Sequence, residues 1–163
     1  MDKFLIKGPC KIKGEVLISG SKNAALPILA STLLFDKPVN IKNLPRVKDV
    51  DTMLNLLKSL GSVIKYSKNK KSVTISKSKK NKCFVPYSLV KTMRAGILVL
   101  GPLIAKHQKS ITSLPGGCLI GARPVNYHLN ALKKLGMKYK IEKGYVHASA
   151  KSNLMGCIIT FPK

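Results

Sequence analysis

Apolar side chains recur at helical spacing in two stretches of the chain, Val47 to Leu60 and Val125 to Leu135. This period predicts two amphipathic helices, each with one face turned toward a core. Each stretch is followed directly by a glycine, Gly61 or Gly136, and glycine commonly terminates helices. We therefore expect both helices to end at these positions.

Two longer apolar stretches, Ser21 to Leu34 and Tyr87 to Ala105, also predict helices. Pro27 is compatible with the first helix if it lies in the first turn, because proline lacks only an amide that is unpaired there. Pro102 predicts a kink or an early end in the second helix. Gly96 in that helix predicts close packing against a neighbour.

Short alternating or β-branched runs predict strands, and turn residues separate them. We expect two hairpins, one formed by residues 62–66 and 72–75 and the other by residues 138–142 and 145–148. The predicted strands are 14–20, 39–44, 62–66, 72–75, 109–113, 138–142 and 145–148.

The chain contains an internal repeat. Leu54 to Gly61 and Leu129 to Gly136 are identical at Leu, Asn, Leu, Lys, Leu and Gly, and each copy precedes a predicted hairpin. The repeated unit is strand–helix–strand–helix–hairpin, so the fold class is α/β (α+β), with helices packed inside against an outer sheet. We expect unit one at 1–82, unit two at 83–154 and the start of a third unit at 155–163. A third unit that only begins predicts that the chain is the N-terminal part of a larger protein.

The formal charge of +24 raises the possibility of a nucleic-acid partner. The 30 basic residues are 27 lysines and only 3 arginines, and aromatic residues make up 6% of the chain. Base readout and stacking favour arginine and aromatic residues. We therefore expect no specific nucleic-acid partner, while a basic module that binds polyanions stays open as an alternative.

The cysteine spacing and the N-terminal residues bear on metal binding and on the cellular compartment of the protein. The four cysteines form no C-x-x-C pair, and the three histidines form no metal-like cluster, so we expect no metal site and free thiols. No apolar run is long enough to span a bilayer, and the first residues do not resemble a signal peptide. We expect a cytoplasmic protein without a membrane partner.

Two segments carry residues suited to chemistry on anions. Lys22 and Asn23 stand at a predicted helix N-terminus, where free amides favour an anion, although plain capping by Ser21 or Asn23 also explains them. The stretch from Ser113 to Val125 combines three glycines, two prolines, Cys118 and Arg123. Its residues fit either an anion-binding loop or an ordinary surface loop with an incidental thiol.

Four motifs in order resemble the enolpyruvyl transferase family across the whole chain. They are Gly20-Ser-Lys-Asn-Ala-Ala-Leu-Pro27, Lys48-Asp-Val-Asp51, Leu89-Val-Lys-Thr-Met-Arg-Ala95 and Leu114-Pro-Gly-Gly-Cys-Leu-Ile-Gly-Ala-Arg-Pro124. The resemblance implies an inside-out α/β barrel, here incomplete, with about two of six repeated units present. It also implies transfer of the enolpyruvyl group of phosphoenolpyruvate to the 3′-hydroxyl of UDP-N-acetylglucosamine, with release of phosphate. This reaction is the first committed step of peptidoglycan precursor synthesis.

The resemblance also assigns roles to individual residues. It implies that Cys118 is the proton donor and can form a covalent adduct, and that Lys22, Asn23 and Arg123 bind phosphoenolpyruvate. It implies no cofactor. The positions that it matches to UDP-N-acetylglucosamine binding are Arg94, Arg123, Pro124, Val125, Asn126, Tyr127 and Lys163.

The chain departs from the family at two points. Asn126 stands where the family usually has aspartate, so a hydrogen-bonding carbonyl remains while a charge is lost. The family's general base, an aspartate, and a further anion-binding arginine belong to a half that this chain does not cover. A non-catalytic remnant therefore stays open beside the transferase interpretation.

Overall fold

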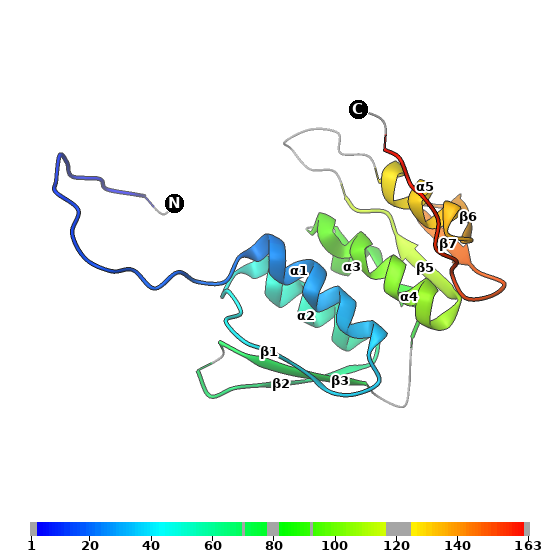
Figure 1. The fold of residues 1–163 in the computed structure, drawn as a ribbon, viewed down its shortest axis with the longest axis horizontal. Coiled ribbons are helices and arrows are strands. Elements are labelled where there is room, and N and C mark those ends of the chain that lie inside the picture. The colour runs from blue at the N-terminus through cyan, green and yellow to red at the C-terminus, as the bar shows by residue number, and fades with distance from the viewer. Residues whose placement is uncertain (1–2, 70, 78–81, 92, 117–124, 162–163) are drawn as a thin grey trace.

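The computed structural model describes residues 3–69, 71–77, 82–91, 93–116 and 125–161. Helices and strands alternate through these ranges in a mixed α/β arrangement (Figure 1). Two open sheets form, and helices cover one face of each. Among the described residues no sheet closes on itself, so the structure leaves the expected barrel as a prediction.

The first half of the chain builds a three-stranded antiparallel sheet in the order β1-β3-β2. Two helices, α1 and α2, pack together above it (Figure 1). The elements are α1 (Lys22–Ser31), the 3-10 helix η1 (Thr32–Leu34), β1 (Val39–Ile41), α2 (Lys48–Ser59), β2 (Ser62–Tyr66) and β3 (Val73–Lys77).

The second half builds a four-stranded sheet in the order β4-β5-β7-β6. Only the pairing of β4 with β5 is parallel. The elements are β4 (Phe84–Val85), α3 (Tyr87–Val90), the 3-10 helix η2 (Arg94–Val99), α4 (Leu100–His107), β5 (Lys109–Ser113), α5 (Asn126–Lys134), β6 (Lys138–Glu142) and β7 (Tyr145–Ser149).

The sequence repeat has a counterpart in the sheets. The order β1-β3-β2 in the first sheet corresponds to β5-β7-β6 in the second, with antiparallel pairing throughout. Helix α2 and helix α5, which carry the repeated sequence, each end before a glycine with positive φ, Gly61 at 103° and Gly136 at 111°. The prediction that these helices stop at glycine is confirmed.

The predicted strand at 14–20 is wrong. Residues 3–20 follow an extended path away from the helices and pair with no strand of the described chain (Figure 1). Leu17 within them is 92% exposed. The expected opening strand of a third unit is also absent from the described residues 156–161. Both runs have β-forming side chains but no partner edge here, because a strand is stabilised by pairing rather than by propensity alone.

The single helix predicted from Tyr87 to Ala105 is also wrong, because the segment breaks into α3, η2 and α4. Met93, buried and extended at φ −134°, separates the first two pieces. Pro102 lies in the first turn of α4, where it begins a helix rather than ending one. By contrast, Pro27 lies inside α1, at its sixth residue.

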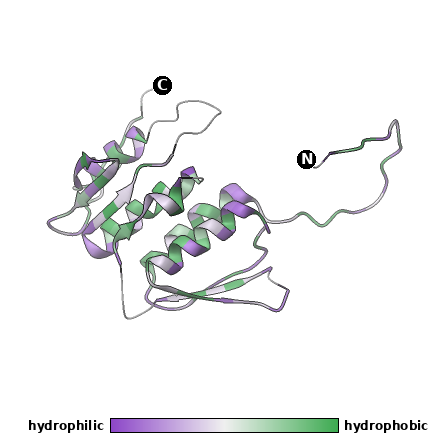
Figure 2. Ribbon diagram, turned by 180° about the vertical axis from the view of Figure 1, so that it is seen from behind, coloured by the Kyte–Doolittle hydropathy of each residue, from purple (hydrophilic) through white to green (hydrophobic). Residues whose placement is uncertain are grey.

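The broken segment 87–107 lies between two hydrophobic cores. Val90, Met93, Val99 and Leu103 join the core formed by α1, α2 and the first sheet. Ile97, Leu100 and Ile104 join the core formed by α5 and the second sheet. Figure 2 shows apolar colour on the inward surfaces of these helices. The two halves therefore share one apolar layer.

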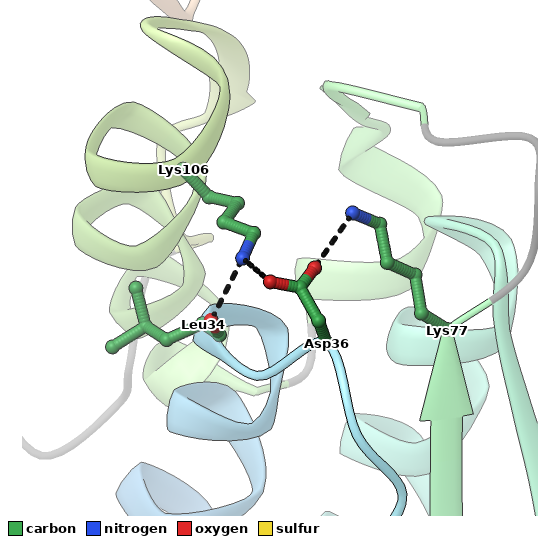
Figure 3. Close-up of polar contacts among 4 residues, drawn as sticks. All are labelled: Leu34, Asp36, Lys77 and Lys106. Carbon is green, nitrogen blue, oxygen red and sulfur yellow. Dashed lines mark hydrogen bonds and ion pairs between the residues drawn. The ribbon is translucent and has the colours of Figure 1, made fainter.

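A polar cluster adds to this connection at the end of α1. Lys106 of α4 donates to the carbonyl oxygen of Leu34 at 3.1 Å and to Asp36 at 2.6 Å, while Lys77 of β3 contacts the other oxygen of Asp36 at 3.1 Å (Figure 3). These hydrogen bonds, first from Lys106 and then from Lys77, lower the pKa of Asp36. One carboxylate thus joins a turn, a strand and a helix.

Candidate functional site

The first part of the site is the N-terminus of α1. The hydroxyl of Ser21 accepts a hydrogen bond of 3.4 Å from the amide of Ala24, so Ser21 is the cap. Lys22 and Asn23 follow in the first turn, and both are exposed. The structure therefore gives Lys22 and Asn23 the placement at a helix N-terminus that the sequence predicted.

Lys22 makes an ion pair that the sequence did not indicate. Its Nζ lies 2.9 Å from Oδ2 of Asp49, in the first turn of α2. Gly20 explains how the two helix N-termini come together, because a side chain there would overlap the carbonyl oxygen of Asn43 in the loop before α2. The close backbone approach at Gly20 sets the start of α1 beside the start of α2.

The second part of the site is the loop that follows β5. The amide of Leu114 donates to the carbonyl of Gly144 at 2.9 Å, which holds the loop's first residue to the second hairpin. Gly116 lies against the backbone of Lys91, where an added Cβ would be 2.5 Å from the carbonyl oxygen. The base of the loop is therefore packed on the break between α3 and η2.

Four of the predicted site residues lie outside the described residues: Cys118, Arg123, Pro124 and Lys163. Their approach to the substrates stays a prediction. The chain is described again at Val125, which precedes α5. Both ends of the predicted catalytic loop are thus placed, one at β5 and one at α5.

The N-terminus of α5 holds three further predicted residues. Val125 occupies the N-cap position without a side-chain capping bond, and its carbonyl accepts the amide of Leu129 at 3.1 Å. Asn126 and Tyr127 form the first turn and are exposed. Among the described residues, no side chain caps this turn, and the side chains of Asn126 and Tyr127 are exposed.

Arg94 lies at the first residue of η2 and is half-buried. The contact of Lys106 with Leu34 brings the far end of α4 to the far end of α1. Helix α1 and the η2–α4 segment therefore run in the same direction, which Figure 1 also shows. Arg94 and Lys22 consequently lie toward the same end of this helical layer, the end on which Gly116 meets Lys91.

The sequence reasoning missed an aromatic contact beside α5. The rings of Tyr127 and Phe161 meet edge to face with centroids 5.8 Å apart. A groove of about 560 Å³ lies here, between α5 and residues 159–161. Aromatic residues at these two positions were the only available signal, and nothing in their spacing of 34 residues indicated contact.

The titratable groups with shifted pKa values lie elsewhere in the described chain. Burial, then the nearby charges of Lys77, Lys106 and Lys109, lower the pKa of His107, at the end of α4. Burial raises the pKa of the Cys83 thiol, before β4. Among the described residues, no three side chains of the metal-binding types come together, and no helix there is long and apolar enough to cross a membrane.

Comparison with known sequences gives one consistent family. The EPSP synthase (3-phosphoshikimate 1-carboxyvinyltransferase) family matches residues 6–162. Curated proteins named UDP-N-acetylglucosamine 1-carboxyvinyltransferase match the whole chain, at 61% identity in Pelagibacter ubique and 55% in Hamiltonella defensa. The chain spans only 39% and 38% of the length of these two relatives.

Solved structures show the same fold. The enolpyruvyl transferase NikO from Streptomyces tendae superposes on 86% of this chain, which covers 30% of NikO, with a TM-score of 0.73 at 20% identity. EPSP synthase from Acinetobacter baumannii superposes on 88%, which covers 33% of that enzyme, with a TM-score of 0.61 at 18% identity. At these identities the likeness concerns the fold alone.

Proposed function

Because the chain belongs to the EPSP synthase family of enolpyruvyl transferases, we propose that it takes part in transferring the enolpyruvyl group of phosphoenolpyruvate to the 3′-hydroxyl of UDP-N-acetylglucosamine. Phosphate is the second product. The reaction is the first committed step toward peptidoglycan, so it serves cell-wall biogenesis, cell shape and cell division. We place it in the cytoplasm.

The observation that carries this proposal is identity along the entire chain. The relative from Pelagibacter ubique is 61% identical over all 163 residues, and its name states this acceptor. The loop Leu114 to Pro124, which contains Cys118, lies within that matched length. The chain covers 39% of that relative, so we propose that residues outside these 163 complete the active site.

The proposed chemistry is addition followed by elimination. A proton from the Cys118 thiol goes to the methylene carbon of phosphoenolpyruvate, while the sugar hydroxyl adds to the neighbouring carbon and gives its own proton to a general base that we place outside these 163 residues. The resulting tetrahedral ketal then loses phosphate together with a proton from the new methyl group, which restores the double bond and can return the proton to the Cys118 thiolate. A cysteine suits the first step when nearby cations let it exchange between thiol and thiolate.

The anionic groups of phosphoenolpyruvate fit the cations of the proposed site. Lys22 and Asn23, on an exposed helix N-terminus, would bind one anionic group, because the free amides and the helix dipole favour negative charge. Arg123 would bind an anionic group through its planar fork. This separation of roles explains why a helix start and an arginine are both needed.

The nucleotide sugar would bind along the start of α5. We assign its contacts to Arg94, Lys163 and the segment Arg123 to Tyr127. Support comes from Asn126 and Tyr127, which are exposed in the first turn of α5, and from Arg94, which is half-buried at the start of η2. A diphosphate suits a helix N-terminus flanked by cations.

We also propose that the repeated units, 1–82 and 83–154, with a third beginning at 155–163, belong to an inside-out α/β barrel. The matching strand orders of the two sheets support the first two units. The helices shared between two cores support an arrangement with helices inside and sheets outside. The barrel would be completed by further units.

Alkylation by fosfomycin tests the proposed function. Fosfomycin is an epoxide that alkylates the loop cysteine of this family. Incubation with fosfomycin and UDP-N-acetylglucosamine should add one adduct, which peptide mass spectrometry should find on Cys118. A Cys118→Ser variant should remain unmodified, while Cys83→Ser, which removes another thiol, should label like the parent.

Turnover provides the second measurement. Phosphate release from phosphoenolpyruvate should require UDP-N-acetylglucosamine and should be lost in Cys118→Ser. The assay is made on the longer protein, which includes the residues outside these 163 that we propose complete the active site. A folded enzyme that gives neither the adduct nor phosphate release would disprove the proposal.

A further inference from the structure

The ion pair between Lys22 and Asp49 joins the first turns of two helices. The Nζ–Oδ2 distance is 2.9 Å, and the side chains are 48% and 35% exposed. Neither group is buried, so the pair adds little to folding. Its location is more informative, because Lys22 is one of the residues assigned to phosphoenolpyruvate.

A lysine on its own is a poorly oriented ligand for an anion. Its ammonium group sits on a four-carbon chain with several rotatable bonds. Asp49 is held more firmly, because it lies within α2, whose neighbouring residues Val50 and Met53 are buried in the core. The ion pair with Asp49 therefore restricts the direction of the Lys22 side chain.

The ion pair leaves Lys22 able to bind a second anion. An ammonium group has three N–H donors, and the ion pair with the single oxygen Oδ2 of Asp49, 2.9 Å away, occupies at most one of them. Two donors remain, beside the free amides at the start of α1. A substrate anion can therefore bind to Lys22 without displacing Asp49.

We propose that Asp49 is a positioning residue, which holds the Lys22 ammonium over the N-terminus of α1 so that its two remaining donors meet the anionic substrate. The inference rests on the proposed function, because it takes phosphoenolpyruvate as the ligand of Lys22. Asp49 itself makes no contact with the substrate.

Two effects of Asp49 oppose one another. Orientation of Lys22 strengthens substrate binding, and the known range for half-exposed ion pairs corresponds to about two- to fivefold in affinity. The carboxylate also repels an anionic substrate, by a comparable factor in dilute buffer. Salt screens both effects, because the ion pair and the substrate contact are exposed. The two effects are therefore separated by a control variant that removes an equal charge from the same turn.

The test compares Asp49→Asn with Asp51→Asn in the complete enzyme. Asp51 lies in the same first turn of α2 and carries the same charge, but the ion pair at Lys22 is made by Asp49. At physiological ionic strength, where the Debye length is about 8 Å, Asp49→Asn should raise the KM for phosphoenolpyruvate about two- to fivefold relative to Asp51→Asn. The KM for UDP-N-acetylglucosamine should not change in either variant.

A double-mutant cycle with Lys22→Gln shows whether Asp49 acts through Lys22. In the Lys22→Gln background, Asp49→Asn should have no further effect on the KM for phosphoenolpyruvate. Asp49→Glu retains the carboxylate and should restore part of the lost affinity. Thermal melting of each variant establishes that the measured proteins are folded.

Distinct results would overturn each proposal. Equal effects of Asp49→Asn in the parent and Lys22→Gln backgrounds, or equal effects of Asp49→Asn and Asp51→Asn, would reject Asp49 as a positioning residue. A parent enzyme without phosphate release or adduct at Cys118 would instead reject the proposed function. If Asp49→Asn does not fold, an Asp49→Glu variant with no more affinity than Lys22→Gln would reject the inference.

Discussion

Single residues determine how the two parts of the candidate site are held. Gly20 allows the start of α1 to approach the loop before α2, and Gly116 allows the base of the proposed catalytic loop to pack on Lys91. In each case a Cβ would overlap a backbone oxygen, which cannot rotate away as a side chain can. These glycines are therefore required by space rather than by an unusual φ.

Replacement of Gly116 by alanine should displace the base of the loop. The new Cβ would lie 2.5 Å from the Lys91 carbonyl oxygen, so we expect a loss of roughly 1–3 kcal/mol in unfolding free energy. Fosfomycin should also label Cys118 more slowly. Gly156→Ala is the control, because its Cβ would meet nothing within 4 Å. Chemical denaturation and adduct kinetics measure both effects, and equal behaviour of the two variants would contradict the prediction.

At the scale of elements, the break in the segment 87–107 organises the site. The separation of α3 from η2 places Lys91 under the loop and Arg94 at the start of η2. Gly96 makes the sharp change of direction possible, since a side chain there would overlap Val90. The far end of the same segment is held by Asp36, which connects α4 to β3 and to the turn after η1.

Replacement of Asp36 by asparagine should lower the melting temperature in a pH-dependent way. Because Lys106 and Lys77 lower its folded-state pKa below the ordinary 3.8, Asp36 stabilises the fold above that pH. The stabilisation is lost as pH falls through the lower folded-state value. The difference in melting temperature between the parent and the variant should therefore be largest near neutral pH and vanish in strong acid. Glu15→Gln, in the extended residues 3–20, should show no such difference.

Across the whole molecule, the two sheets are coupled through the helices between them. Val99 is buried in the first core and the adjacent Leu100 in the second. A rotation or loss of this segment would expose both cores. We therefore expect the two halves to unfold together rather than as independent units.

Leu129→Ala tests this coupling, because Leu129 is 1% exposed in the second core. The cavity should cost about 2–5 kcal/mol. Hydrogen exchange should show the same loss of protection in β3 of the first sheet as in β7 of the second. Asn130→Ala, on the exposed side of α5, should change little. Independent loss of the second sheet, with β3 unchanged, would contradict a shared core.

The sequence by itself determined most elements, their repetition and the family. Helical period and terminal glycines identified α2 and α5, since burial of one helix face imposes that period on any sequence. The repeat predicted corresponding elements in the two halves, and the corresponding strand orders of the two sheets are a finding of the structure. The motif around Lys22 and Asn23 also placed them correctly at a helix start, because capping is a local interaction.

Only the tertiary structure decided which elements have partners and which side chains meet. The β-forming run 14–20 pairs with no strand of the part of the chain that the structure describes, while Phe84–Val85, too short to predict, pairs with β5. The contacts of Lys22 with Asp49 and of Tyr127 with Phe161 join residues 27 and 34 positions apart in the sequence. Pairing and contact depend on what lies opposite in space, and local sequence does not contain that information.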